Sequence, residues 1–322
     1  MRAILITRPG PADVLAIGDA PRPDLTADSI RIAVRATAVN RADLLQREGH
    51  YPPPPGASTI LGLECAGAVS EVGANVRGWS VGDRAMALLP GGGYAEEVVV
   101  HAGSAMHVPD ALSDEEAAAI PEVFLTAFLN LFMLARVREG ETALIHGGGS
   151  GVGTAATTLL KLAGVRVIVT AGSAEKCARC IEHGADVAIN YREEDFVEKA
   201  RGVNVILDHI GARYLDRDLD ALASDGRIVI IGSMGGQRTA EIDVGRLLMK
   251  RAQILGSTLR ARPVEEKAAI VAAFIDRFDV AHIRPVIHTV MPLERAAEAH
   301  KLMEASEHFG KIVLRVGPPT TS

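Results

Sequence analysis

The sequence predicts an α/β protein with two domains, an irregular β-barrel and a doubly wound parallel sheet. Before about residue 120, short alternating runs such as Ile30–Val39 and Cys65–Gly73 are separated by Gly and Pro turns. From about residue 140, short apolar strands alternate with helical segments, and after about residue 284 the earlier pattern returns. We therefore predict a barrel domain over 1–120 and 285–322, with the sheet domain inserted as 121–284. A cleft between two such domains is a common ligand site.

Six mainly apolar runs are the predicted strands of the parallel sheet, because strands buried on both faces lack polar alternation. They are Thr142–His146, Arg166–Thr170, Val187–Asn190, Asn204–Asp208, Arg227–Ile231 and Gln253–Gly256. The most apolar stretch of the chain, Ala117–Val137, is interrupted by Pro121, Glu122 and Asn130. We interpret it as a buried helix and not as a membrane span.

Composition excludes several classes of protein. Of the 322 residues, 48% are hydrophobic and 23% charged, which allows a sizeable core. The net charge is −6 and no Lys/Arg run is present, which argues against nucleic acid as a partner. Three cysteines and an N-terminus without a signal-peptide pattern predict a reduced, cytoplasmic protein that is not in a membrane.

A Gly-rich loop, GGGSGVG (147–153), follows the first predicted strand and leads directly into a helix. Small residues let the backbone approach a pyrophosphate, and the free amides at a helix start attract its charge. Aligned on Gly153, the outer glycines are Gly148 and Gly153, and Ser150 takes the middle position. Because further strand–helix units follow, we favour a dinucleotide site over an ordinary tight turn.

The end of the second strand, TAGSAEK (170–176), selects the nucleotide. An NAD site places Asp or Glu at this strand tip to hold the ribose. Here Ser173 can donate a hydrogen bond and Lys176 carries a positive charge, which favours the extra phosphate of NADPH. Glu175 would oppose that phosphate if it pointed inward, and Ser173 could simply cap its helix while Lys176 is solvated. Tyr191 either flanks the adenosine or is a half-buried surface tyrosine.

Seven segments together closely resemble the zinc-independent quinone oxidoreductases of the zeta-crystallin group, within the medium-chain dehydrogenase/reductase superfamily. They are NRADLLQREGHYPPPPGAS, ILGLECAG, VGDRAMALLPGGGYAE, AAAIPEVFLTAF, GSGVGTAA, TAGSAEK and HFGKIVL. The match extends over nearly the whole chain with the segments in the same order, and it is closest to the tumour-suppressor-inducible branch. The resemblance implies a GroES-like catalytic domain, a Rossmann domain, usually a homodimer, and NADPH-dependent reduction of quinones.

The resemblance also implies site residues. Asn40 and Tyr51 match positions beside the nicotinamide, and Lys311 matches a late cofactor contact. The expected cofactor-binding set is Asn40, Thr126, Gly148, Ser150, Gly151, Val152, Gly153, Gly172, Ser173, Lys176, Tyr191, Ile231, Gly232, Ser233, Met234, Ser257, Thr258, Leu259 and Lys311. Within it, 231–234 and 257–259 match segments that line the nicotinamide.

The sequence argues against a metal site. Zinc alcohol dehydrogenases of the same superfamily use a Cys where this chain has the segment beginning at Asn40, and a His-Glu pair where it has Leu63-Glu64. With these ligands missing, no closed tetrahedral site can be assembled there. Cys177 and Cys180 lie three apart on a predicted helix without a second ligand pair, so we interpret them as incidental to helix packing. His146 and His209 each follow a sheet strand, and a structural histidine is the favoured interpretation of each.

Hydride transfer leaves negative charge on the acceptor oxygen, which donors already in place would stabilise. Asn40 and Tyr51 are the candidate catalytic residues, although Tyr51 could instead only shape the cleft. Without a metal to polarise the acceptor, the acceptor itself must be electron-poor, as quinones and enones are.

Three functions stay open at this point. The leading one is NADPH:quinone reductase. The second is an enoyl or enone reductase, and the third is a structural or RNA-binding zeta-crystallin-like protein that binds NADPH with little turnover. We also predict a homodimer, because QILGST (253–258) would lie at the edge of the sheet and exposed edges tend to be paired.

Overall fold

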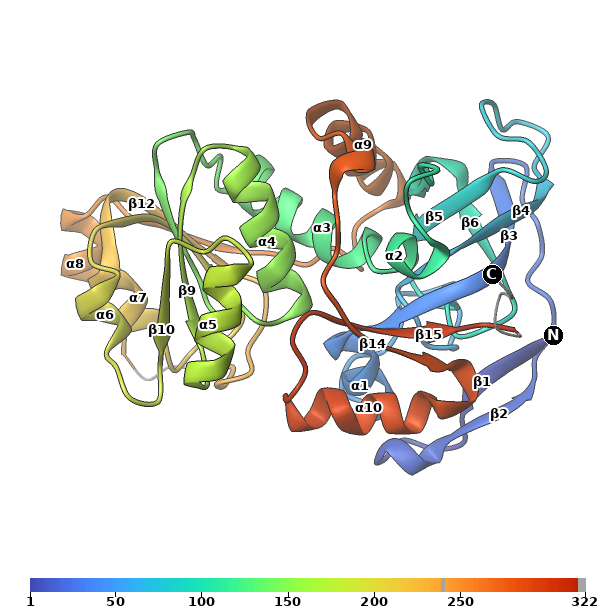
Figure 1. The fold of residues 1–322 in the computed structure, drawn as a ribbon, viewed down its shortest axis with the longest axis horizontal. Helices are drawn as coiled ribbons and strands as arrows, with labels where there is room; N and C mark the ends of the chain where they lie inside the picture. The colour runs from blue at the N-terminus through green and yellow to red at the C-terminus, as the bar shows by residue number, and fades with distance from the viewer. Residues whose placement is uncertain (239–240, 318–322) are drawn as a thin grey trace. The chain divides into compact units, whose positions relative to one another are not determined.

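The computed structural model describes residues 1–238 and 241–317, and the chain divides into two compact units (Figure 1). Unit 1 comprises Met1–Leu125 and Arg260–Ser322, and unit 2 comprises Thr126–Leu259. The expected α/β fold, a GroES-like barrel domain with an inserted doubly wound sheet, is confirmed.

The boundaries differ from those expected at 120/121 and 284/285. Residues 260–284 belong to unit 1 because the helix α9 (Val264–Arg277) packs there on the short helix η2 (Ala102–Ser104). The contact is close, since a Cβ added at Gly103 would lie 2.7 Å from the Ala268 Cβ. The sequence pattern of α9 resembles that of the sheet-covering helices, so the pattern alone could not assign it.

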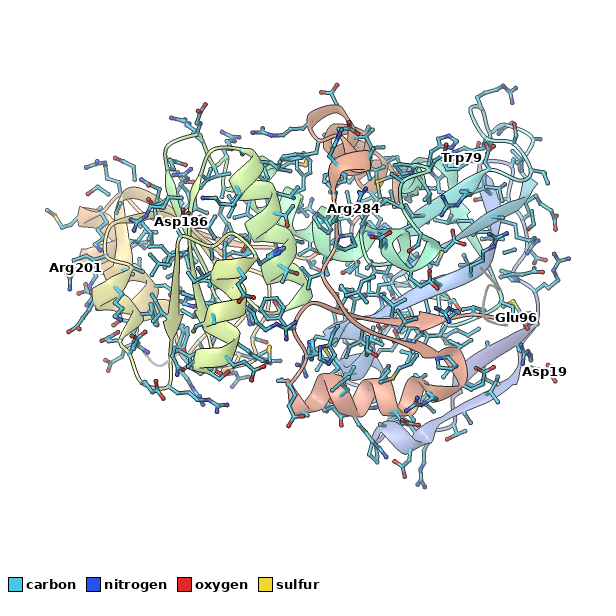
Figure 2. All side chains as sticks on the ribbon, in the orientation of Figure 1. Asp19, Trp79, Glu96, Asp186, Arg201 and Arg284 are labelled. Carbon is cyan, nitrogen blue, oxygen red and sulfur yellow. The ribbon has the colours of Figure 1, made fainter. Side chains whose placement is uncertain are left out.

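Unit 1 contains a β-hairpin and a seven-stranded sheet in the order β14-β15-β3-β4-β5-β7, with β6 also paired to β3. Its strands are β1 (Arg2–Ile6), β2 (Leu15–Asp19), β3 (Ser29–Val39), β4 (Glu64–Val72), β5 (Arg84–Leu88), β6 (Glu97–His101), β7 (Ala105–His107), β14 (Ile287–Pro292) and β15 (Lys311–Arg315). Its other helices are α1 (Arg41–Arg47), α2 (Asp114–Ala118) and α10 (Ala296–Ala305). Apolar residues of β3, β4 and β15 form the centre of its core. Trp79, labelled in Figure 2, belongs to this unit, and its ring stacks on that of His107 with centroids 3.9 Å apart.

Unit 2 contains a six-stranded parallel sheet in the order β10-β9-β8-β11-β12-β13, the doubly wound order that reverses beside the first strand. The strands are β8 (Thr142–Ile145), β9 (Arg166–Ala171), β10 (Val187–Asn190), β11 (Val203–Asp208), β12 (Leu222–Ile230) and β13 (Gln253–Gly256). The helices are α4 (Gly151–Leu162), α5 (Ala174–Glu182), α6 (Phe196–Lys199), α7 (Leu215–Ala221) and α8 (Val244–Met249). Asp186, labelled in Figure 2, joins α4 to β9 by accepting from Lys161 Nζ at 2.8 Å and Val167 N at 2.7 Å.

The apolar stretch 117–137 is helical and largely buried as expected, but it is not one helix. It runs from the end of α2 into α3 (Pro121–Phe128) and then a π-helical segment, Leu129–Leu134. Pro121 begins α3, because proline is favoured at the first helical position. Within the described residues, no helix combines the length and apolar character needed to cross a bilayer.

Candidate functional site

The Gly-rich loop of unit 2 has the geometry of a phosphate cradle. Ser150 is the N-cap of α4, and its Oγ accepts from Gly153 N at 3.0 Å. A Cβ at Gly153 would lie 2.3 Å from the Gly147 carbonyl oxygen, so only glycine lets the loop fold onto the helix start. A Cβ at Gly148 would similarly lie 2.6 Å from the Val169 Cβ. The amides of Gly151 and Val152, in the first turn of α4, have no intrahelical acceptor and can bind an anion.

The positive charge expected at the end of β9 is present. Lys176 is partly buried, and burial together with the charges of Arg179 and Arg192 lowers the pKa of Lys176. Arg179 and Arg192 therefore lie close enough to Lys176 to affect its charge, and the exposed Glu175 acts on it in the opposite direction. Such a cluster attracts an anionic group more strongly than a lone lysine would.

Ser173 and Tyr191 lie in the same region. Ser173 is the N-cap of α5, with its Oγ accepting from Lys176 N at 3.2 Å, so the capping interpretation holds. Its hydroxyl hydrogen is not used by that bond. Tyr191 is 43% exposed, and a Cβ at Gly172 would lie 2.8 Å from its hydroxyl oxygen. Gly172 therefore leaves room for the tyrosine ring beside the strand tip.

The remaining expected cofactor residues of unit 2 follow the carboxyl ends of other strands, except Thr126, which lies in α3. Ile231, Gly232, Ser233 and Met234 follow β12, and Ser257, Thr258 and Leu259 follow β13. In a parallel sheet these ends share one edge, which is where doubly wound folds bind ligands. Ser257 Oγ is buried and has no hydrogen-bond partner among the described residues, so it keeps a free polar group at this edge.

In unit 1, Asn40, Glu64 and Lys311 form a buried polar cluster. Lys311 Nζ donates to Glu64 Oε1 at 2.7 Å, to Asn40 Oδ1 at 2.7 Å and to the Val39 carbonyl at 3.2 Å. Asn40 Nδ2 donates to Glu64 Oε1 at 2.8 Å and to the Ala38 carbonyl at 3.3 Å. The ion pair is almost completely excluded from water, with side-chain exposures of 3% for Lys311 and 0% for Glu64.

The register of the sheet brings these three residues together. In the β3–β15 ladder Val39 pairs with Ile312, so Asn40 and Lys311 lie opposite one another just beyond it. In the β3–β4 ladder Thr37 pairs with Cys65, which places Glu64 beside the end of β3. Lys311 is 271 residues from Asn40 and 247 from Glu64 along the chain, so no local pattern predicts its contacts with them.

Tyr51 packs against Arg260, a residue that sequence reasoning did not select. The Arg260 guanidinium lies 5.3 Å from the Tyr51 ring centroid, within the range of a cation–π contact. Arg260 Nη2 also donates to Gln46 Oε1 at 2.5 Å and Nε to the Pro90 carbonyl at 2.8 Å. Arg260 thus fixes the loop that carries Tyr51 to the body of unit 1.

Glu122 and Lys267 were also missed. Glu122 N donates to Glu64 Oε2 at 2.9 Å, and the Glu122 Oε2 atom is buried without a hydrogen-bond partner among the described residues. Burial and the neighbouring Glu64 charge raise the pKa of Glu122 to about 8. Lys267 on α9 donates to the Arg260 carbonyl at 2.7 Å. The available signal was a charged residue within an apolar run, as in AAAIPEVFL and ILGLECAG.

The cluster around Asn40 does not fit a zinc ion. Leu63 is apolar and buried, and Asn40 Oδ1 already accepts from the Lys311 ammonium. A divalent cation beside that ammonium would be repelled, and it would lack the nitrogen and sulfur ligands that zinc prefers.

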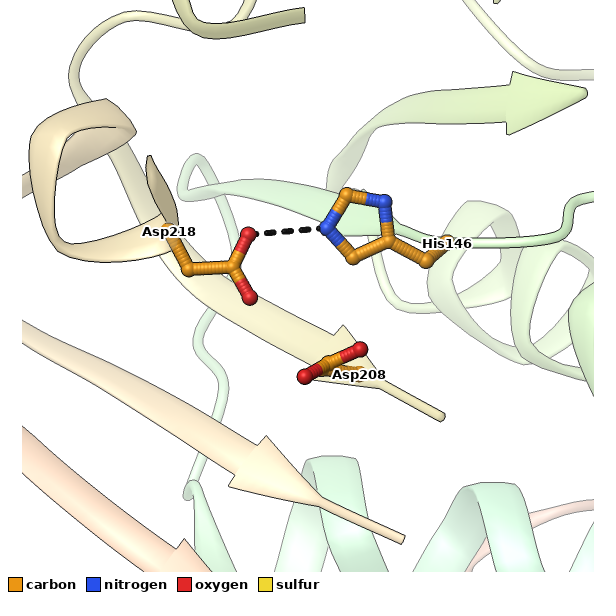
Figure 3. Close-up of side chains that lie close together, drawn as sticks. All are labelled: His146, Asp208 and Asp218. Carbon is orange, nitrogen blue, oxygen red and sulfur yellow. Dashed lines mark hydrogen bonds and ion pairs between the residues drawn. The ribbon is translucent and has the colours of Figure 1, made fainter. Parts of the chain in front are cut away.

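A second buried cluster, His146, Asp208 and Asp218, lies in unit 2 and has one potential ligand atom from each residue within 4.8 Å of the others (Figure 3). His146 Nε2 pairs with Asp218 Oδ1 at 2.9 Å, and Nδ1 with Thr170 Oγ1 at 3.1 Å. Asp208 accepts from two backbone amides, and burial and the Asp218 charge raise the pKa of Asp208 to about 6. Because both ring nitrogens are engaged, this arrangement agrees with a structural histidine.

Comparison with known proteins defines the class. Residues 26–110 match the alcohol dehydrogenase GroES-like domain, and residues 151–276 match the zinc-binding dehydrogenase domain. The chain therefore has the two domains of a GroES-like dehydrogenase, which makes it a medium-chain dehydrogenase/reductase.

Among sequence relatives, human quinone oxidoreductase is 31% identical over 98% of this chain and 97% of its own length. Among solved structures, Escherichia coli quinone oxidoreductase complexed with NADPH has a TM-score of 0.85 and 28% identity, covering 98% of this chain and 100% of that one. The CurK enoyl reductase has a TM-score of 0.86 and 27% identity, covering 98% and 99%. The chain belongs to the quinone oxidoreductase family, the zeta-crystallin-like branch of that superfamily, and is an oxidoreductase.

Proposed function

We propose that this protein is an NADPH-dependent quinone oxidoreductase that transfers hydride to quinones or similar electron-poor carbonyl compounds. The observation that carries the cofactor choice is the group of cationic side chains Lys176, Arg179 and Arg192 near the end of β9. The last residues of the strand and the one after it, 170–172, include no acid, and the nearby acid is the exposed Glu175 of α5. The extra phosphate of NADPH would bind there, with Ser173 donating a hydrogen bond and Tyr191 flanking the adenosine. The pyrophosphate would bind the Gly151 and Val152 amides.

The choice of acceptor follows from the chemistry of unit 1. Lys311 and Glu64 neutralise one another at the position where a metal-dependent relative would polarise its substrate. The acceptor must then accept hydride without Lewis-acid activation, and quinones and enones do so readily. We propose that Tyr51 and Asn40 contact the acceptor or the nicotinamide. Asn40 would offer the amide hydrogen that now makes the long 3.3 Å bond to Ala38.

Parallel assays test the proposal. Binding of NADPH and NADH would be compared by calorimetry, and NADPH consumption would be followed with 1,4-benzoquinone and with a crotonyl thioester. We expect tighter NADPH binding and rapid turnover of the quinone. Turnover of the thioester alone would contradict the quinone assignment, and equal affinity for NADH would contradict the phosphate site.

A second candidate, enoyl reductase, is favoured by the structural likeness to the CurK enoyl reductase. Both reactions begin with hydride transfer from the same cofactor and differ in whether oxygen or carbon finally takes up the proton. The same two-substrate assay separates them.

We further propose a homodimer formed through β13, the strand at the edge of the parallel sheet. Large apolar side chains are exposed on α8 just before it, with Leu248 74% and Met249 77% exposed, and burying them would favour association. Sedimentation at micromolar concentration should show a dimer, and a monomer alone would refute it.

We also propose a cytoplasmic location, and the free cysteines agree with it.

A further inference from the structure

Among the polar groups that surround Asn40 in unit 1, hydrogen-bonding capacity is almost fully used. Lys311 directs its ammonium hydrogens to three oxygen atoms, and the Asn40 amide directs its hydrogens to Glu64 and Ala38. Glu64 Oε1 accepts from both side chains and Oε2 accepts from the Glu122 amide. In this group of described residues, the Glu122 side chain alone has a buried oxygen, Oε2, with no partner.

The charges around Glu122 come from several elements. Glu64 on β4 and Asp43 on α1 disfavour a second negative charge, whereas Lys311 on β15 and Arg260 after β13 favour it. Glu122 in turn interacts favourably with Lys267 on α9. Lys311 is already paired with Glu64 at 2.7 Å, so its charge is largely compensated. As a whole residue Glu122 is intermediate in exposure, whereas its unpartnered Oε2 atom is buried.

We propose that the Glu122 carboxyl group is the proton donor of the reduction. This inference rests on the proposed function. Hydride leaves NADPH, which becomes NADP⁺, and bonds to the acceptor. The acceptor is then an anion, on oxygen for a quinone or an enone enolate. The Glu122 O–H bond breaks and its proton passes to that anion, and the Glu122 carboxylate recovers a proton from water. Acceptor, NADPH and one proton are thus converted to the reduced acceptor and NADP⁺.

A carboxyl group in this role must stay protonated near neutral pH, and its surroundings meet that requirement. The pKa of about 8 arises first from burial and then from Glu64, which lies against the same helix start. An acid whose pKa lies near the working pH is an efficient proton donor.

The kinetic test compares the full-length wild type with Glu122→Gln and Glu122→Asp, using NADPH with a quinone and with an enone. We expect kcat of Glu122→Gln to fall about 100-fold for the enone, which is typical of the loss of a general acid, with the KM for NADPH nearly unchanged. The wild-type kcat should decrease above about pH 8, that break should vanish in Glu122→Gln, and Glu122→Asp should partly restore both rate and break. Glu198→Gln, which removes an exposed carboxyl on α6, is the matched control and should behave as wild type.

Tyr51→Phe separates the two possible donors. If Tyr51 supplied the proton, this variant would lose the pH break and Glu122→Gln would keep it, which would overturn the proposal.

Infrared difference spectra between pH 7 and pH 10 give a readout that is independent of turnover. We expect a protonated carboxyl band in the wild type at pH 7 that is absent from Glu122→Gln. An ionised Glu122 at pH 7 would refute the donor role even if a variant folded poorly.

Failure of this inference and failure of the proposed function are distinguishable. A wild-type protein that oxidises NADPH with no quinone or enone contradicts the proposed function. Rapid wild-type turnover, with unchanged kcat and pH profile in Glu122→Gln, contradicts only the role of Glu122.

Discussion

Lys311 Nζ lies 2.7 Å from Oε1 of Glu64, and this ion pair is buried between residues that are 247 positions apart. Removing one partner of a buried pair leaves an uncompensated charge without water. We expect Lys311→Met to lower the free energy of unfolding by about 3–5 kcal/mol in urea denaturation. The double variant Lys311→Met/Glu64→Gln should regain much of that loss.

Arg251→Met is the control for this prediction, because its partner Asp225 and Arg251 itself are both about two-thirds exposed, and it should change stability little. If Lys311→Met were as stable as the wild type, the folded protein would not need the Lys311 ammonium to compensate the buried charge of Glu64.

Lys176→Ala should weaken NADPH binding and leave NADH binding nearly unchanged, because only NADPH carries the phosphate that the ammonium would contact. We expect a loss of about tenfold or more in NADPH affinity by calorimetry, since a charge-assisted hydrogen bond contributes roughly 1.5–3 kcal/mol. Lys199→Ala, a change at a lysine half-exposed on α6, should bind both cofactors as the wild type does. Equal losses for NADH and NADPH would place Lys176 away from the phosphate.

Removal of metal ions should leave the activity intact. The donor set around Asn40 does not suit zinc, and the His146 ring has both nitrogens engaged. After dialysis against EDTA, we expect kcat with benzoquinone to be unchanged, and we expect added Zn²⁺ not to increase it. A loss of activity that Zn²⁺ restores would disprove the metal-free reaction.

His300 should contribute to the loss of stability in acid. Burial and the nearby Arg47 charge lower the pKa of His300 to about 3, whereas the unfolded chain titrates near 6.5. Below pH 6.5 the unfolded state therefore binds more protons than the folded state, and stability falls as the pH falls toward 3. In His300→Gln, the slope of unfolding free energy against pH should be smaller by up to about 1.4 kcal/mol per pH unit in this range. Parallel slopes for the two proteins would show that His300 is protonated in the folded state.

The sequence predicted those features that depend on neighbouring residues. The six strands of unit 2 and the Gly-rich loop follow from local runs of apolar residues and from glycine spacing. Five of the strands lie within one residue of their expected bounds, whereas β12 begins at Leu222, before the expected start at Arg227. Ser173 was correctly considered as a helix cap, because the capping pattern is local.

The polar cluster of unit 1 could not be predicted in the same way. In the sequence, Glu64 was notable only because Leu63 beside it stands where zinc-dependent relatives have a histidine. Glu122 was notable only because it interrupts an apolar stretch. Their significance comes from Lys311 and Arg260, which the barrel brings close from distant parts of the chain. The assignment of α9 failed for the same reason, since its packing on Ala102–Ser104 is a tertiary contact.

The pairing of β15 with β3 has a consequence for biosynthesis. The barrel needs a strand that leaves the ribosome only after the whole inserted sheet has been made, while all six strands of that sheet are available earlier. Contacts between segments so far apart in the chain form slowly. We therefore expect the nucleotide-binding unit to fold first. The N-terminal part of the barrel would stay incomplete until β15 leaves the ribosome and pairs with β3.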